Sequence, residues 1–208
     1  MELYFAPLAC SLATRIALYE AGAPARFTYV DLKSKRTEDG SDFLTINPLG
    51  QVPTLRTDAG ELLTENTAVL QHVADALPDA KLAPTDRRGR ARLHEWLGFI
   101  GTELHKGIFA LHFDVATNDT IKELARGKVA SRFGHLEKHL AKREFLLDQF
   151  TVVDAYLATL LNWTQKTGPN LNDWPAVQAY HRRMLARPAV AKAAGEEYGL
   201  YAAELKRG

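Results

Sequence analysis

The sequence predicts a small α/β domain followed by an all-helical bundle. Two observations carry this prediction. Short apolar strand-like stretches and a helical pattern alternate near the start of the chain, in the order strand, helix, strand. Beyond residue 84 the apolar residues recur at helical spacing. The break between these patterns places the first domain at residues 1–79, a linker at residues 80–86 and the helical domain at residues 87–208.

The first domain opens with a strand at residues 2–5. Leu12, Ile16 and Tyr19 then fall on one helical face, and a second strand is expected at residues 27–32. A strand, a crossover helix and a second strand predict a parallel pair. A charged loop follows and leads to a short helix around Phe43.

A β-hairpin is expected next. Residues 54–55 and 62–63 are short apolar pieces on either side of an Asp58-Ala59-Gly60 corner. Thr64 then stands where a helical pattern begins, so it is the expected N-cap of a helix that runs to about residue 77.

Four helices and a shorter terminal one are expected in the second domain. The first spans residues 87–113, which contain no proline, and the second lies around residues 121–140. The segment 151–154 resembles a capping box that opens the third, and residues 173–187 form the fourth. The buried stripe expected on the third helix consists of Val152, Ala155, Tyr156, Thr159, Leu160 and Trp163.

Composition restricts the class of protein. The chain of 208 residues has 46% hydrophobic and 25% charged residues, as in ordinary globular proteins, and its net charge of +1 gives no electrostatic reason to expect nucleic acid or an anionic membrane as partner. We expect no membrane span and no signal peptide. The single cysteine excludes an internal disulfide and favours a reducing compartment, so the cytoplasm is the expected location.

The segment 47–66 predicts a ligand groove. Pro53 at the entrance of a strand suits an edge position or a cis bond, and it leaves the backbone of Val52 available to a ligand. Glu65 and Asn66 lie at a helix N-terminus, where free N–H donors favour a carboxylate. Together these features suit an extended, peptide-like ligand with an acidic end.

Cys10 and Ser11 lie in the turn between the first strand and the first helix. The positive end of that helix lowers the pKa of a thiol and favours thiolate, although a buried structural cysteine fits the position equally well. Ser11 is interpreted as the helix N-cap or as a donor to a bound thiolate. A dithiol redox enzyme would need a second cysteine, and the chain has none.

Three more candidates carry charge or titrate. His105 suits a hydrogen-bond donor or base near neutral pH because the adjacent Lys106 opposes its protonation; a solvated polar face is the alternative for both. Lys35 suits a cation for a ligand carboxylate.

Trp96 and Trp163 are expected in the helical core, with the lining of an apolar pocket as the alternative.

Five ordered motifs resemble those of the bacterial glutathione S-transferases of the beta class. They are Cys10-Ser11, the Asn-Pro-Leu-Gly-Gln-Val-Pro segment at 47–53, Leu-Thr-Glu at 63–65, Glu-Leu-His-Lys-Gly at 103–107 and Phe-Thr-Val-Val-Asp-Ala-Tyr at 150–156. The resemblance covers nearly the whole chain. It implies a thioredoxin-like N-terminal domain, a helical-bundle C-terminal domain, a homodimer, glutathione as cosubstrate and no metal.

The resemblance also assigns roles to residues of the first domain. Cys10 would lie beside the glutathione sulfur and form a mixed disulfide with it. Val52, with Pro53 cis, would pair its backbone with the cysteinyl part. Glu65 and the N–H of Asn66 would hold the γ-glutamyl end.

The remaining assignments complete the glutathione site. Lys35 would reach the glycyl carboxylate, and the helical domain would contribute Thr102, Glu103, His105 and Lys106, with the last two nearest the sulfur. Two positions depart from the family pattern: Asn66 stands where glycine or serine is frequent, and Gly98 stands where an asparagine is frequent. We interpret Gly98 as making room in an altered electrophile pocket.

The expected function is therefore glutathione transfer to small hydrophobic electrophiles in detoxification. Cys10, Ser11 and the helix N-terminus would hold glutathione as thiolate, which attacks an electrophilic carbon placed over the helical domain, with His105 assisting. Two alternatives stay open at this point. One is a glutathione-dependent thiol–disulfide reductase or peroxidase that uses Cys10, and the other is a non-catalytic module that binds apolar ligands or a partner.

Overall fold

The computed structural model describes residues 1–113, 116–166 and 168–207. The chain forms two compact units, one made of residues 1–83 with 188–208 and the other of residues 84–187. This division differs from the expected domains in one respect, because the C-terminal helix belongs to the first unit.

The first unit contains a five-stranded sheet in the order β3-β2-β1-β4-β5. β1 (Glu2–Phe5) pairs in parallel with β2 (Arg26–Asp31), which confirms the predicted strand–helix–strand unit around α1 (Leu12–Glu20). On its other side β1 pairs antiparallel with β4 (Thr54–Arg56).

The predicted hairpin is confirmed, and one strand was not expected. β4 pairs antiparallel with β5 (Leu62–Leu63), and Gly60 at the corner has a φ of +84°, a left-handed conformation that glycine adopts without strain. β3 (Arg36–Thr37) lies within the charged loop that the sequence predicted as irregular. A two-residue edge strand of polar residues has no apolar alternation to reveal it.

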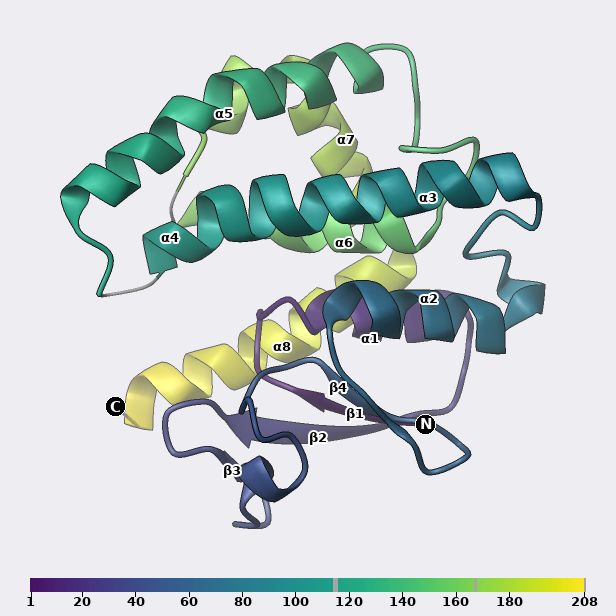
Figure 1. Ribbon diagram of the computed structural model, residues 1–208, viewed down its shortest axis with the longest axis vertical. Helices are drawn as coiled ribbons and strands as arrows, with labels where there is room; N and C mark the ends of the chain where they lie inside the picture. Colours follow the sequence, from purple (N-terminus) through teal and green to yellow (C-terminus); the bar gives the residue numbers. More distant parts are fainter. Residues whose placement is uncertain (114–115, 167, 208) are drawn as a thin grey trace. The chain divides into compact units, whose positions relative to one another are not determined.

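Both faces of the sheet are covered (Figure 1). α1 lies side by side with α2 (Asn66–Ala76), and α8 (Pro188–Arg207) packs along α1. The 3₁₀ turn η1 (Phe43–Thr45) covers the other face, where buried Phe43 packs with Tyr4, Ala6, Val30 and Val52. The central strand is therefore buried on both sides.

The N-terminus of α2 differs from the expectation. The predicted cap Thr64 lies outside the helix, and the N-cap is Glu65, which has a φ of +65° and makes no capping hydrogen bond with its side chain. A non-glycine residue in this conformation is uncommon. The first N–H groups of α2 are consequently left without a side-chain cap.

The second unit begins with a long helical run over the predicted residues 87–113. It consists of α3 (Arg87–Phe99), the π-helical segment η3 (Ile100–Phe109) and α4 (Ala110–Phe113). Asp86 caps its start by accepting hydrogen bonds from the N–H groups of Arg88 and Gly89. The change of helical type within the run was not predicted, because apolar spacing does not separate an α-helix from a π-helix over a few turns.

The other helices of this unit follow the predicted order. α5 (Asp119–Leu140) and α7 (Pro175–Leu185) lie where the second and fourth helices were expected, and 3₁₀ turns occupy Trp163–Gln165 (η4) and Leu171–Asp173 (η5).

The first unit contains a further 3₁₀ turn at Pro78–Ala80 (η2). Its terminal helix α8 has 20 residues and is longer than predicted.

Helix α6 (Val152–Asn162) is buried on every side, which corrects the predicted stripe. It packs against η3, α3 and α7, so it has no solvent face. The predicted capping pair at its start is present: an Asp154 carboxylate oxygen accepts from Thr151 N–H at 2.9 Å, and the other accepts from Tyr180 Oη at 2.9 Å.

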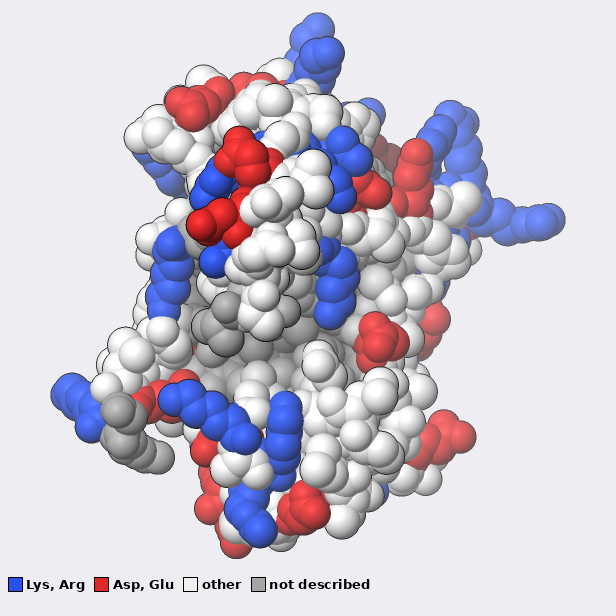
Figure 2. Space-filling view, turned by 60° about the vertical axis from the view of Figure 1, so that its left-hand side comes forward, with Lys and Arg blue, Asp and Glu red and all other residues white. Residues whose placement is uncertain are grey.

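The surface carries both signs of charge. On the face shown in Figure 2, basic and acidic side chains are interspersed. Within the described residues no helix is both long and apolar enough to cross a membrane.

A buried histidine links the stability of the second unit to pH. His181 is 6% exposed, and its Nε2 lies 2.9 Å from Asn162 Oδ1. Burial lowers the pKa of His181 to about 4. Between pH 6.5 and pH 4 the unfolded chain therefore binds a proton at this imidazole that the folded chain does not.

We predict that the free energy of unfolding falls as the pH falls through this window, and that His181→Gln reduces the fall. One histidine contributes up to about 1.4 kcal/mol per pH unit there. Urea unfolding at pH 7.5 and pH 5.0 measures the difference. Asn162→Ala is the matched control, since it breaks the same hydrogen bond but keeps the imidazole. An equal pH dependence in wild type and His181→Gln would contradict the assignment.

Candidate active site

Helix α8 anchors the loop before Cys10. Leu8 has a φ of +59°, and its N–H donates to the carboxylate of Glu197 at 2.7 Å. The N–H of Ala9 donates to the carbonyl of Ala6 and closes a turn. Cys10 is thereby held at the end of a loop whose backbone is anchored to a buried carboxylate of α8.

Ser11 occupies the N-cap position of α1, but its side chain does not cap the helix. The residue is fully buried, and its Oγ donates to the carbonyl of Ala6 at 3.3 Å. The hydroxyl therefore ties the helix start to the end of β1. This contact gives Ser11 a structural role that the sequence did not predict.

The thiol of Cys10 meets a residue that is 42 positions away in the sequence. Its Sγ donates to the carbonyl of Val52 at 3.2 Å. The Val52-Pro53 bond is cis, as predicted. The contact therefore links the end of the Cys10 loop to the segment that is expected to bind the ligand.

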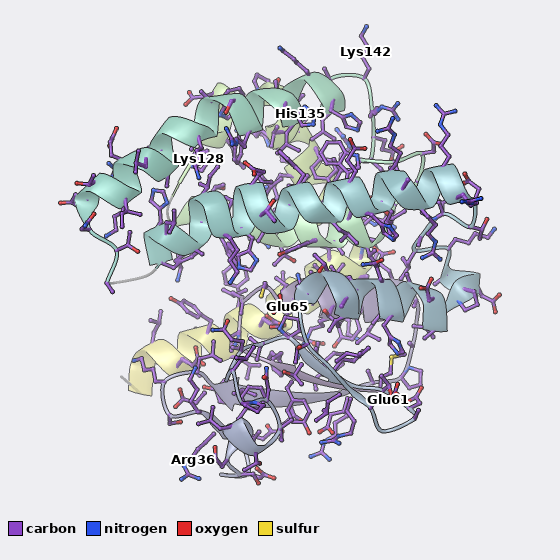
Figure 3. All side chains as sticks on the ribbon, in the orientation of Figure 1. Arg36, Glu61, Glu65, Lys128, His135 and Lys142 are labelled. Carbon is purple, nitrogen blue, oxygen red and sulfur yellow. The ribbon has the colours of Figure 1, made fainter. Side chains whose placement is uncertain are left out.

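Two residues of the segment that is expected to bind the ligand have polar groups without partners. Among the described residues the N–H of Val52 has no hydrogen-bond partner. Glu65 lies at the start of α2 (Figure 3). Asn66 is only 7% exposed, and neither its amide nitrogen nor its amide oxygen has a partner. Because a buried unsatisfied amide is costly, these groups indicate a place for a polar ligand.

Lys35 lies over the turn that precedes Val52. Its φ is +58°, and its Nζ donates to the carbonyl of Gly50 at 2.9 Å. A lysine ammonium has three donors, so this contact leaves donors for a carboxylate.

Of the predicted site residues in the second unit, His105 has the most strongly shifted pKa. Its Nδ1 lies 2.7 Å from Tyr156 Oη. Burial, with a smaller contribution from the adjacent charge of Lys106, lowers the pKa of His105 to about 4. The imidazole is therefore neutral near pH 7, and among the described residues its Nε2 has no hydrogen-bond partner.

The side chains next to His105 in the sequence differ in the hydrogen bonds that they make. The hydroxyl of Thr102 donates to the carbonyl of Gly98 at 2.9 Å. The carboxylate of Glu103 accepts from Nε and an Nη of Arg132 at 2.8 and 2.6 Å, so it is drawn towards α5. Lys106 is exposed. Glu103 thus holds η3 to α5. The two partners are 29 positions apart in the sequence, so sequence spacing does not reveal their contact.

Gly98 is not required by packing. A Cβ at this position would meet no atom within 4 Å, so no neighbouring residue requires a glycine here, and the role of Gly98 in an altered electrophile pocket stays a prediction. Gly107 differs, because a Cβ there would lie 2.9 Å from the carbonyl oxygen of Thr102. The π-helical backbone around His105 therefore depends on a glycine at 107.

The two tryptophans have different surroundings. Trp96 is 6% exposed and packs against His135 and His139 of α5, in agreement with the core prediction. Trp163 is half-buried, and its ring meets those of His105 and Phe113 edge to face, at centroid distances of 5.1 and 5.3 Å. Trp163 thus belongs to an aromatic cluster with His105 and Phe113, and the pocket alternative for it stays a prediction.

Sequence reasoning missed two residues of this arrangement. Glu197 holds the Cys10 loop from 189 residues away, and Tyr156 orients His105 from the buried helix α6. Tyr156 was predicted only as part of a core stripe, and no local spacing connects either residue to its partner. No group of three or more potential metal ligands occurs among the described residues.

Comparison with known proteins identifies the family of this chain. Residues 1–75 match the family model of the glutathione S-transferase N-terminal domain, and residues 99–188 match that of the C-terminal domain. The chain is 40% identical over 199 residues to glutathione S-transferase GstA of Escherichia coli O157:H7, an alignment covering 95% of this chain and 98% of that protein. This chain belongs to the glutathione S-transferase family.

Two solved structures are similar to this chain in both sequence and fold, and they indicate the class of transferase. A sphingomonad glutathione S-transferase complexed with glutathione has a TM-score of 0.89 and 42% identity, covering 95% of this chain and 98% of the other. A bacterial beta-class glutathione S-transferase of Sphingomonas chungbukensis gives the same identity, TM-score and coverage. The particular relatives of this chain are therefore bacterial enzymes of the beta class, as the sequence motifs predicted.

We predict that Gly107→Ala destabilises the protein by about 1 kcal/mol or more, because the new Cβ overlaps the carbonyl oxygen of Thr102. Gly127→Ala in α5 is the matched control. It meets no atom within 4 Å and should stabilise by up to about 1 kcal/mol through helix propensity. Urea unfolding of both variants measures the two signs. Stabilisation by both alanines would show that the segment accepts ordinary α-helical geometry.

Proposed function

We propose that this glutathione transferase binds glutathione along the Val52 segment and the start of α2, and transfers its sulfur to a small hydrophobic electrophile. The buried, unpartnered amide of Asn66 is the observation that carries the binding proposal. It lies at an uncapped helix N-terminus, where N–H donors favour a carboxylate. The relative complexed with glutathione supports this ligand.

The ligand's three parts suit three groups of residues. The γ-glutamyl end, which carries both an ammonium and a carboxylate, is bound by Glu65 and by the N–H and amide of Asn66. The backbone of Val52, with its N–H available, pairs with the cysteinyl part. Lys35 binds the glycyl carboxylate with the donors that Gly50 leaves.

The helical unit contributes the groups around the sulfur. Neutral His105, held by Tyr156, presents Nε2 as donor or acceptor, and the exposed ammonium of Lys106 stabilises negative charge on the glutathione sulfur. Thr102 belongs to the same surface of the segment. Glu103 acts through its contact with Arg132, which fixes η3.

The chemical step is attack by the glutathione thiolate on an electrophilic carbon. The thiol proton goes to solvent or to a base, the carbon–sulfur bond forms, and the leaving group departs with the bonding pair. Cys10 lies beside the sulfur. Because its thiol donates to Val52, we assign activation for attack on carbon to the N-terminus of α1 and to His105.

We propose in addition that the enzyme acts as a cytoplasmic homodimer in detoxification. The single cysteine and the interspersed surface charge support a reducing compartment and a partner other than nucleic acid. Analytical ultracentrifugation of the full chain tests the dimer.

A second activity is favoured by one observation. Cys10 is partly exposed in the turn before α1, a position that suits exchange with a disulfide. In glutathione-dependent reduction of a mixed disulfide, the Cys10 thiolate would attack the glutathionyl sulfur and release the substrate thiol. A second glutathione would then attack the Cys10–glutathione disulfide, release Cys10 and leave as oxidised glutathione.

We predict that Asn66→Leu raises the KM for glutathione about tenfold or more, since a hydrogen bond to a charged ligand is lost, while the ligand-free protein is not destabilised. Thr14→Val is the matched control. It also removes a buried oxygen without a partner, yet it should leave the KM unchanged. Steady-state kinetics and urea unfolding give both readouts. An unchanged KM in Asn66→Leu would refute the assigned role.

We predict that Cys10→Ala keeps conjugation of glutathione to a chloronitrobenzene within about tenfold of wild type, because its thiol is committed to Val52. The same variant should lose glutathione-dependent reduction of a mixed disulfide. Spectrophotometric assays with each substrate measure the two activities. A loss of conjugation above about a hundredfold, with glutathione still bound, would assign thiol activation to Cys10.

A further inference from the structure

A fully buried carboxyl group of α8 lies against the loop that carries Cys10, and no step of the proposed reaction uses it. One oxygen of Glu197, Oε2, accepts from the N–H of Leu8 at 2.7 Å. The other, Oε1, lies 3.2 Å from Nε of Arg15. Because a buried ionisable group is costly unless it is paired, the presence of a glutamate at this place calls for a reason.

Packing of α8 onto α1 accounts for only one of the two contacts. Nη1 of Arg15 also donates to the carboxylate of Glu196 at 3.2 Å, and Tyr19 Oη donates to the same oxygen at 2.6 Å. Both donors belong to α1 and Glu196 belongs to α8, so the two helices are joined by polar contacts without Glu197. What Glu197 adds is the contact with Leu8.

The backbone of Leu8 has a conformation that needs support. Its φ of +59° lies in the left-handed region, which is unfavourable for a residue with a Cβ. Two further hydrogen bonds of the loop end at β1, since the N–H of Ala9 and the Oγ of Ser11 both donate to the carbonyl of Ala6. Glu197 supports the same loop from α8.

The loop continues directly into the start of α1. The N–H of Leu12 donates to the carbonyl of Ala9 at 3.0 Å, so the first turn of the helix is built on the loop. Among the described residues the N–H of Ser11 has no hydrogen-bond partner, which leaves it available to an anion. A displacement of Leu8 would therefore move this N–H together with the helix start.

We propose that Glu197 is a positioning residue for the sulfur chemistry: by holding the N–H of Leu8, it sets where Cys10 and the N–H of Ser11 meet the glutathione sulfur. The inference rests on the proposed function, in which the N-terminus of α1 holds the glutathione thiolate. Because the Glu197 side chain is fully buried, it acts through the loop. A displacement of about 1 Å can reduce the rate of a reaction about a hundredfold, so a small shift is measurable.

Two double variants separate the hydrogen bond to Leu8 from the buried charge. Arg15→Met is combined with Glu197→Gln in one and with Glu197→Leu in the other, so both remove the same two ionisable groups. Methionine suits position 15, where the guanidinium lies over two aromatic rings. Glutamine keeps an oxygen that accepts from Leu8, whereas leucine has none. Arg15 is replaced in both because one amide oxygen cannot serve two donors.

We predict that kcat for conjugation of glutathione to a chloronitrobenzene is about tenfold or more lower in the Glu197→Leu double variant than in the Glu197→Gln double variant. The latter should stay within about threefold of wild type. The KM for glutathione should stay within about twofold in both, because the groups assigned to its two ends are unchanged. Glu196→Gln is the matched control, since it removes a carboxyl group of α8 that does not contact the loop. Equal kcat values in the two double variants would overturn the proposal.

Nuclear magnetic resonance of the ligand-free protein distinguishes failure of this inference from failure of the proposed function. The amide proton of Leu8 should resonate downfield in wild type, because its hydrogen bond to Glu197 is short. It should move upfield in the Glu197→Leu double variant, with shifts of the Cys10 and Ser11 amide signals that the Glu197→Gln double variant lacks. Unchanged Cys10 and Ser11 signals would overturn the positioning role. Shifted signals in a protein whose wild type does not conjugate glutathione would support the hold on Cys10 and refute the transferase reaction.

Glu197→Asp provides a test that does not remove the buried pair. Aspartate keeps a carboxyl group beside Arg15 but is one methylene shorter, so it cannot reach Leu8 without moving the loop. We expect kcat to fall about fivefold or more with the KM for glutathione unchanged, and the Cys10 and Ser11 amide signals to shift. Wild-type kcat and signals in this variant would overturn the proposal even where the double variants do not fold, which urea unfolding establishes.

Discussion

The contact on which the first unit depends most is the buried carboxylate of Glu197. It is fully buried and accepts the N–H of Leu8 at 2.7 Å, while its other oxygen lies 3.2 Å from Nε of Arg15. Burial raises the pKa of Glu197 to about 8, and the guanidinium of Arg15 opposes that rise. Because a buried carboxylate is costly unless it is paired, this group fixes α8, α1 and the Cys10 loop in one arrangement.

The rest of the first unit is consistent with this anchor. The guanidinium of Arg15 lies over the rings of Phe5 and Phe27, at 4.1 and 4.3 Å from their centroids, so the cation is held by the sheet as well as by α8. The loop that Glu197 holds then brings Cys10 to Val52. The same buried carboxyl group thus supports the packing of α8 and the position of the thiol.

Much of the fold and of the site follows from local pattern. The parallel pair and the β4–β5 hairpin were predictable because turn residues and apolar alternation act over a few residues. At Pro53 the residues alone left an edge position and a cis bond open, and the family resemblance implied the cis bond that the structure shows. The cap of α2 was not, since Thr64 is the better capping residue and Glu65 nevertheless takes that position with a positive φ. Likewise, the hydroxyl of Ser11 bonds to Ala6 because it is buried, whatever its propensity to cap.

By itself, the sequence determined the order of strands and helices, the class of protein through its ordered motifs, and the identity of most candidate residues. Only the tertiary structure decided which unit α8 joins, which polar groups lack partners, and why His105 is neutral. These properties depend on burial and on contacts across long stretches of chain, as between Leu8 and Glu197 or between His105 and Tyr156. Local spacing carries no information about such contacts, because desolvation and pairing arise only when distant residues pack together.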